Sequence, residues 1–140
     1  MSRLSIIVPV LDEGDVVASM LDGLAGLRAL GVEVIVVDGG SRDATVERAR
    51  LRADRVLAAP RGRATQMNAG AARASGDVLL FVPADTRLPA DAEHVVLDGL
   101  RRSGRVWALI DRGCASGLGL SADARSASSH CETLQSRRLA

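Results

Sequence analysis

Short apolar runs alternate with helix-like segments through most of this chain, and this alternation constrains its fold more than any other feature. The runs cover residues 4–10, 32–37, 55–58 and 78–82, and their length and β-branched content are typical of strands. Strands that alternate with helices form a parallel sheet, and right-handed crossovers then leave a Rossmann-like topology. We therefore expect an α/β fold with helices on both faces of the sheet, in three α/β/α layers.

The fourth run, 78–82, is followed by an acidic loop. Five successive apolar residues show no alternation, which predicts a strand buried on both faces. Pro83 cannot donate to a ladder and should end this strand. Asp85 is then expected at the carboxyl edge of the sheet, where open α/β folds bind ligands. A loop aspartate is also a common turn residue, and that alternative stays open.

The segments between the runs carry helix signals. Asp12 is expected to be the N-cap of a helix whose apolar spacing runs on to a stop at Gly31. Ser41 is expected to cap the next helix. The remaining helices are expected over residues 42–52, 62–75 and 90–102.

Acidic residues follow three of the expected strands. Asp12 and Glu13 come after the first, Asp38 ends the second, and Asp85 follows the fourth. Parallel strands point the same way, so these side chains should gather along one edge of the sheet. Two local alternatives compete, because Asp12 is also a good helix cap and Asp38 also a good turn residue before two glycines.

The first strand–helix junction argues against a dinucleotide site. Residues 9–14 contain neither Gly-x-Gly-x-x-Gly nor Gly-Lys-Ser, so a pyrophosphate seated on the following helix is not expected. Acidic side chains repel phosphates unless a divalent cation lies between them. The pattern favours recognition of a base and ribose by carboxylates, with Mg²⁺ or Mn²⁺ contacting the phosphates.

Composition narrows the class of protein. The formal net charge of the 140 residues is +1, which does not suggest a nucleic-acid partner. No apolar run approaches the roughly 20 residues of a membrane span. The first strand begins too early for a signal peptide, and the two cysteines have no metal-ligand spacing, so we expect a cytoplasmic protein with free thiols.

Three segments in order resemble a known family. Residues 5–13, residues 34–45 and the Asp85 loop are similar to the nucleotide-sugar half of family 2 glycosyltransferases with the GT-A fold. Residues 61–71 most resemble the subgroup associated with arsenosugar biosynthesis. The resemblance implies inverting transfer of a sugar from a nucleotide-diphospho-sugar donor to an acceptor, and it identifies neither the sugar, the base nor the acceptor.

The resemblance also implies a nucleoside site. Pro9, Leu11 and Glu13 would line the nucleoside pocket, and Leu11 stands where the family often has an aromatic residue. Asp38 would accept hydrogen bonds from the base or ribose.

The diphosphate and metal contacts are implied in the same way. Arg63, or less favourably Arg61, lies where a basic residue can approach the diphosphate. Asp85 corresponds to the last acid of the family's Asp-x-Asp metal motif, which binds Mg²⁺ or Mn²⁺. Pro83 replaces the first acid of that motif, so the metal would depend on Asp85 and on phosphate oxygens.

The resemblance is expected to end near residue 106. We divide the chain into a nucleotide-diphospho-sugar-binding half domain over 1–107 and an atypical tail over 108–140, which contains no valine or proline. A shifted reading frame or a flexible C-terminus would explain such a tail. The acceptor half would then be missing, so the catalytic base is not assigned and the chain would be a donor-binding fragment.

Two other classes compete with a glycosyltransferase. A non-catalytic Rossmann-like module for nucleotide binding or dimerisation, forming a homodimer, would also show this pattern of strands and helices. A receiver-type phosphotransfer domain places acids at strand ends as well, but it needs a strand-end lysine, and the chain has no lysine.

Overall fold

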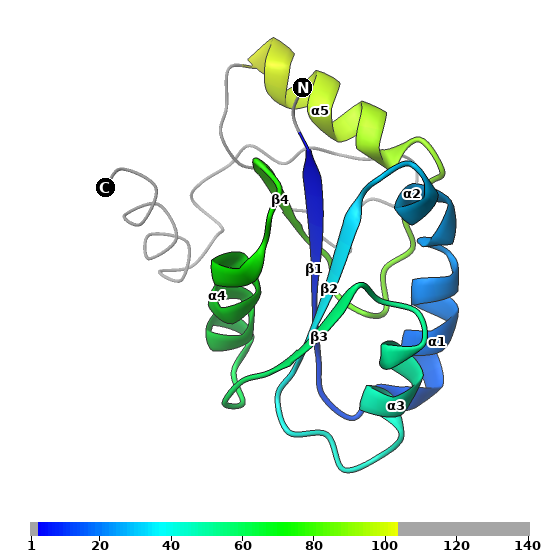
Figure 1. Ribbon diagram of the computed structural model, residues 1–140, viewed down its shortest axis with the longest axis vertical. Coiled ribbons are helices and arrows are strands. Elements are labelled where there is room, and N and C mark those ends of the chain that lie inside the picture. Colours follow the sequence, from blue (N-terminus) through cyan, green and yellow to red (C-terminus); the bar gives the residue numbers. More distant parts are fainter. Residues whose placement is uncertain (1–2, 104–140) are drawn as a thin grey trace.

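The computed structural model describes residues 3–103, in which strands and helices alternate along the chain (Figure 1). The predicted domain boundary at residue 107 and the tail 108–140 lie outside these residues. The elements are β1 (Leu4–Val10), α1 (Gly14–Asp22), α2 (Ala25–Ala29), β2 (Glu33–Asp38), α3 (Thr45–Arg50), β3 (Arg55–Ala58), α4 (Arg63–Arg73), β4 (Val78–Phe81) and α5 (Ala92–Ser103).

The four strands form one parallel sheet in the order β3-β2-β1-β4. β1 is central, with Val10 opposite Asp38 in β2 and Ile7 opposite Phe81 in β4. The predicted α/β Rossmann-like fold is thus confirmed. The chain runs from β1 through β2 to β3 on one side, and β4 then returns to the other side of β1.

Helices cover both faces of the sheet (Figure 1). The larger core packs alternate β1 residues such as Ile6 and Val8 against apolar residues of α1, α2, α3 and α5. On the opposite face Ile7, Ile35 and Val37 are fully buried, and α4 packs over them. This alternation of side chains is what a strand covered on both faces requires, and it gives the three expected layers.

Gly70 allows α4 to lie very close to the sheet. A Cβ atom added at this residue would lie 2.5 Å from Cγ2 of Ile7 and 3.0 Å from Cγ2 of Val37. The first distance is shorter than carbon–carbon contacts allow and the second is tight, so even alanine would push the helix or the strands apart.

Two expectations about the elements were wrong. The helix expected to continue to Gly31 is divided into α1 and α2. The fourth strand is not buried on both faces: Leu80 is fully buried, whereas Leu79 and Phe81 are half-buried. The physical reason is that β4 lies at an edge of the described sheet, and α4 packs against the other three strands.

No helix within residues 3–103 combines the length and the apolar character needed to cross a membrane.

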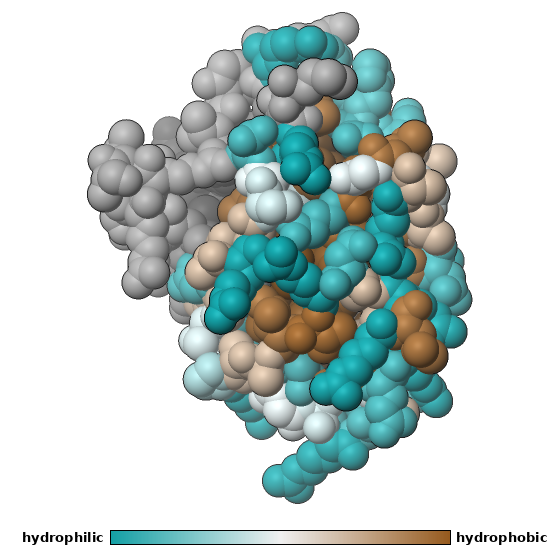
Figure 2. All heavy atoms as spheres, viewed as in Figure 1, coloured by the Kyte–Doolittle hydropathy of each residue, from teal (hydrophilic) through white to brown (hydrophobic). Residues whose placement is uncertain are grey.

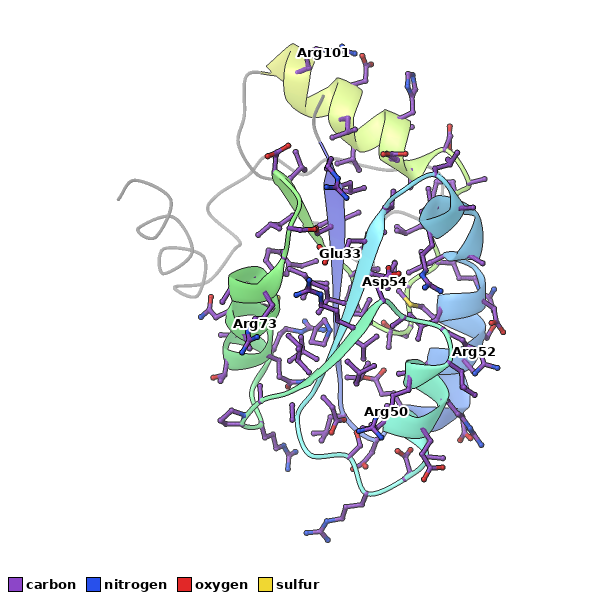
Figure 3. All side chains as sticks on the ribbon, viewed as in Figure 1. Glu33, Arg50, Arg52, Asp54, Arg73 and Arg101 are labelled. Carbon is purple, nitrogen blue, oxygen red and sulfur yellow. The ribbon has the colours of Figure 1, made fainter. Side chains whose placement is uncertain are left out.

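Glu33 anchors the amino edge of the sheet, where β2 begins (Figure 3). Its Oε2 accepts hydrogen bonds from the Ser5 hydroxyl at 2.7 Å, and from the Ser75 N–H and hydroxyl at 2.8 and 2.9 Å. Its Oε1 lies 3.5 Å from Nε of Arg55, and the side chain is 13% exposed. Burial raises the pKa of Glu33, but these donors and Arg55 outweigh it, so the pKa lies below its ordinary value.

The lowered pKa predicts how Glu33 contributes to stability with pH. A carboxyl whose pKa is lower in the folded state stabilises the fold above its unfolded pKa and loses this contribution as pH falls through the folded pKa. We expect Glu33→Gln to lower the free energy of unfolding by about 1–2 kcal/mol at neutral pH. The difference in the free energy of unfolding between wild type and Glu33→Gln should shrink below about pH 4.

Urea unfolding across this pH range measures the difference. Glu47→Gln on the exposed surface of α3 makes the same change of net charge and serves as the control. A Glu33→Gln difference that stays constant from neutral to acid pH would contradict the assigned role of the carboxylate.

Candidate functional site

The carboxyl edge of the sheet gathers residues from separate parts of the chain. All described strands are parallel, so the segments that follow β1, β2 and β4 leave at the same edge. Asp12 and Glu13 follow β1, Asp38 is the last residue of β2, and Asp85 lies in the loop after β4. Arg63 begins α4, which leads back from this edge. The predicted acids therefore share one edge, while their roles in binding stay predictions.

β1 and β4 stop pairing before Pro9. The last hydrogen bond between them is donated by the Val82 N–H to the Ile7 carbonyl, at 3.0 Å. β1 continues to pair with β2 as far as Val10, opposite Asp38. Hydrogen bonds alternate between the two sides of a strand, so Pro9 lacks its N–H on the side of β4, where pairing has ended. The gap between these strand ends is a topological switch point, which is where open α/β sheets bind ligands.

Asp38 is 6% exposed and forms the turn that follows β2. Its Oδ2 accepts hydrogen bonds from the N–H groups of Gly40 and Ser41, at 3.1 and 3.0 Å. Its Oδ1 accepts the Ser41 hydroxyl. Asp38 therefore is the turn residue that one sequence alternative described. Each carboxylate oxygen accepts about two hydrogen bonds, so Oδ1 keeps capacity for one more donor.

The loop after β1 is joined to the loop after β2. The Asp12 N–H donates to the Ser41 hydroxyl at 2.8 Å, and Oδ1 of Asp12 accepts the Arg42 N–H at 2.7 Å. Asp12 has a φ of 49°, in the left-handed region, which aspartate tolerates better than most residues. The expected capping roles of Asp12 and Ser41 are wrong, because both side chains bond across the loops, and α1 and α3 begin at Gly14 and Thr45.

The first turn of α1 is capped from a distant segment. Gly14 N–H donates to Oδ2 of Asp43 at 3.0 Å, and Glu13 N–H donates to the hydroxyl of buried Thr45, also at 3.0 Å. Arg48 donates to the Gly14 carbonyl. Hydrogen bonds from the hydroxyl and N–H of Thr45, then from Gly14, lower the pKa of Asp43. These contacts make the two loops one structural unit at the edge.

The structure also places the other predicted site residues. Leu11 and Glu13 are half-buried beside the turn of Asp38, and Arg61 and Arg63 are exposed at the start of α4. Asp85 is exposed within a turn that the Thr86 N–H closes on the Pro83 carbonyl, at 3.0 Å. Residues 3–103 hold no cluster of three histidine, cysteine or acidic side chains that would bind a metal by themselves.

Sequence reasoning missed three residues of this edge: Asp43, Thr45 and Gln66. The short spacing in Asp43-Ala44-Thr45 is a local signal, because aspartate often bonds to the backbone two residues on at a helix start. Gln66 has a weaker signal, a polar residue in an alanine-rich helix.

The fold and this edge define an α/β protein of the Rossmann-like class, with acidic side chains at its switch point. The comparison with family models is more specific. The chain belongs to glycosyl transferase family 2, whose model matches residues 5–122. This match continues past residue 106, where we expected the resemblance to end.

Solved glycosyltransferase structures share the fold. A mannosyltransferase from Pyrobaculum calidifontis, in complex with GDP-Man and Mn²⁺, has 25% identity and a TM-score of 0.62 over 71% of this chain and 32% of its own. Glucosyl-3-phosphoglycerate synthase from Mycobacterium tuberculosis, with Mn²⁺, UDP and phosphoglyceric acid, has 26% identity and a TM-score of 0.62 over 71% and 39%. S. aureus TarS 1–349 has 25% identity and a TM-score of 0.61 over 71% and 32%.

The chain thus spans about a third of the length of these structures. No curated protein sequence matches it.

Proposed function

We propose that this chain binds a nucleotide-diphospho-sugar at the carboxyl edge of its sheet and forms the donor-binding part of an inverting glycosyltransferase. One observation carries the proposal: in a family 2 chain, the acid that ends β2 and the acid in the loop after β4 lie at the same edge, on either side of β1, at the switch point. From the resemblance of residues 61–71, we also propose that the chain belongs to the arsenosugar-associated subgroup. A cytoplasmic location stays a prediction.

The nucleoside is proposed to lie against the ends of β1 and β2. Pro9 and Leu11 supply apolar surface, and Glu13 closes the pocket. Asp38 accepts a hydrogen bond from the base or ribose through Oδ1, while Oδ2 stays bonded to the turn. Arg63, with Arg61 as the second candidate, approaches the diphosphate from the start of α4.

Asp85 is the residue proposed to hold Mg²⁺ or Mn²⁺. A single exposed carboxylate fits an ion that arrives with its nucleotide, because Mg²⁺ is usually held by one or two carboxylates, substrate phosphates and water. Two of the similar structures contain Mn²⁺. The cation would stabilise the negative charge that develops on the departing diphosphate.

The proposed reaction is a single in-line displacement. The acceptor hydroxyl oxygen bonds to the anomeric carbon as the bond from that carbon to the diphosphate oxygen breaks, and a base takes the hydroxyl proton. We assign no residue as this base. The acceptor-binding part is proposed to lie outside the region described here, because the chain covers about a third of its structural neighbours.

Calorimetry with UDP and GDP, each with and without Mn²⁺, tests the proposal. We expect wild type to bind one of them, and more tightly with Mn²⁺. Asp85→Ala should abolish the Mn²⁺ enhancement of nucleotide binding, because the protein ligand of the ion is lost.

Asp91→Ala is the matched control, since it removes an exposed carboxylate from the same loop between β4 and α5. Asp91→Ala should keep the full Mn²⁺ enhancement of nucleotide binding. Full Mn²⁺ enhancement in Asp85→Ala would refute the metal role, and absence of binding to either nucleotide by wild type would refute the donor site.

A dimerisation module is the second candidate function, and the surface around β3 favours it. β3 lies at an edge of the described sheet, and Leu51, which precedes it, is 82% exposed. Figure 2 shows hydrophobic side chains at the surface over β3. An exposed edge with apolar neighbours can pair with a second copy. Sedimentation analysis showing a stable dimer, together with no nucleotide affinity, would support this candidate over the first.

A further inference from the structure

Gln66 is a buried side chain that joins three segments of the carboxyl edge. It projects from α4 and is 4% exposed. Its Nε2 donates to the carbonyls of Val10 at 2.8 Å and Val37 at 2.9 Å. Its Oε1 accepts the Gly62 N–H at 3.3 Å. One amide group thus contacts the ends of β1 and β2 and the residue before α4.

A primary amide is well suited to this position. The amide nitrogen donates to two carbonyls, of which that of Val10 also accepts the Gly39 N–H at 3.0 Å. The amide oxygen accepts the Gly62 N–H, so a rotated amide would place oxygen against oxygen at the two carbonyls. A carboxylate has no donor for the carbonyls, and an apolar side chain has neither donor nor acceptor. Gln66 therefore cannot be replaced without loss of hydrogen bonds inside the fold.

Each backbone group that Gln66 contacts lies next to a residue of the proposed site. Val10 precedes Leu11, Val37 precedes Asp38, and Gly62 precedes Arg63.

The backbone at Gly39, which follows Asp38, also lies against the side-chain amide of Gln66. A Cβ atom added at Gly39 would lie 2.8 Å from Oε1 and 3.0 Å from Nε2 of Gln66. Glycine at position 39 lets the turn of Asp38 lie directly against the amide.

We propose that Gln66 is a positioning residue, which sets the distances between the nucleoside-binding ends of β1 and β2 and the diphosphate-binding start of α4. This inference rests on the proposed function for its meaning in binding. Its structural part, that one amide holds the three segments in register, is measurable without a ligand.

Gln66→Glu is the principal test, because it keeps the shape and removes the donors. At about pH 8 we expect nucleotide affinity, for whichever of UDP or GDP wild type binds, to fall roughly tenfold relative to wild type. Burial raises the pKa of such a carboxyl, and its protonated form regains one donor. The ratio of wild-type to variant affinity should therefore decrease at about pH 5.5, a change that general destabilisation would not produce.

Asn68→Asp is the matched control, since it makes the same amide-to-acid change two residues along α4, at a half-buried side chain. It should bind nucleotide as wild type does at both pH values. Gln66→Met, which keeps the length and removes every hydrogen bond, should show the tenfold loss with no recovery in acid, and it decides the question if Gln66→Glu does not fold.

Amide hydrogen exchange supplies the ligand-free measurement. In Gln66→Met we expect faster exchange at Gly39, Ser41 and Gly62, and unchanged exchange at Val34, which bonds to Asp54 at the far end of β2. Wild-type exchange at these three amides, or wild-type affinity in a folded variant, would overturn the inference. Failure of wild type to bind any nucleotide would refute the proposed function, while the exchange result would still decide the positioning role.

Discussion

Gly70→Val is expected to lower the free energy of unfolding by about 3 kcal/mol, the largest stability effect among the substitutions considered. Cβ alone would lie 2.5 Å from Cγ2 of Ile7, and the two methyl groups of valine need further room against the sheet. Ile7 and Val37 are fully buried within strands, so neither can move aside without displacing its strand. α4 would have to lift away and lose packing over the whole face.

Guanidinium unfolding followed by circular dichroism measures the effect as a lower midpoint at a similar slope. Gly26→Ala is the control, because an added Cβ there has no atom within 4 Å and Gly26 lies in α2. It should be neutral or stabilise by up to about 1 kcal/mol through helix propensity. An unfolding midpoint for Gly70→Val equal to that of wild type would show that α4 does not lie this close to the sheet.

Asp38→Ala is expected to weaken nucleotide binding by about 1.5–3 kcal/mol, or roughly 10–150-fold, as for a lost hydrogen bond to a charged group. The same substitution removes the acceptor of the Gly40 and Ser41 N–H groups, so the turn loosens as well. Binding and folding must therefore be measured on the same variants.

Asp38→Asn separates the two effects. Its Oδ1 can accept both turn N–H groups, so the turn should persist while the charge offered to the nucleotide is lost. We expect calorimetry to give it an affinity between those of wild type and Asp38→Ala. Asp77→Ala, which removes a carboxylate at the opposite edge of the sheet, should bind as wild type does. Wild-type nucleotide affinity in a folded Asp38→Ala variant would show that Asp38 does not contribute to binding.

Most of the sheet could be predicted from sequence because its two central strands, β1 and β2, are buried apolar runs. Residues 4–10 and 55–58 are strands at the predicted positions, and the second strand differs by one residue at each end. Burial selects β-branched residues over a whole segment, so the signal is local and repeated. The inference from apolar residues to burial failed for the fourth run, because an apolar sequence does not show whether helices cover both faces of the strand.

The contacts between loops could not be predicted in the same way. Asp12 and Ser41 each have the local signature of a helix cap, and each instead bonds to the other loop. The residues that do cap α1 are Asp43 and Thr45, which lie 29 and 32 positions from their partners. Sequence spacing carries no information about a bond that exists only after the sheet has formed.

The capping of α1 by a later segment has a consequence for the order of assembly. A nascent chain that has not yet emerged as far as Thr45 lacks both acceptors for the first amides of this helix, so those amides stay bonded to water. The beginning of α1 can reach its final state only when the next β–α unit docks beside it. Synthesis must therefore reach the start of α3, within the second crossover, before the first crossover is complete, which couples the earliest helix to residues translated later.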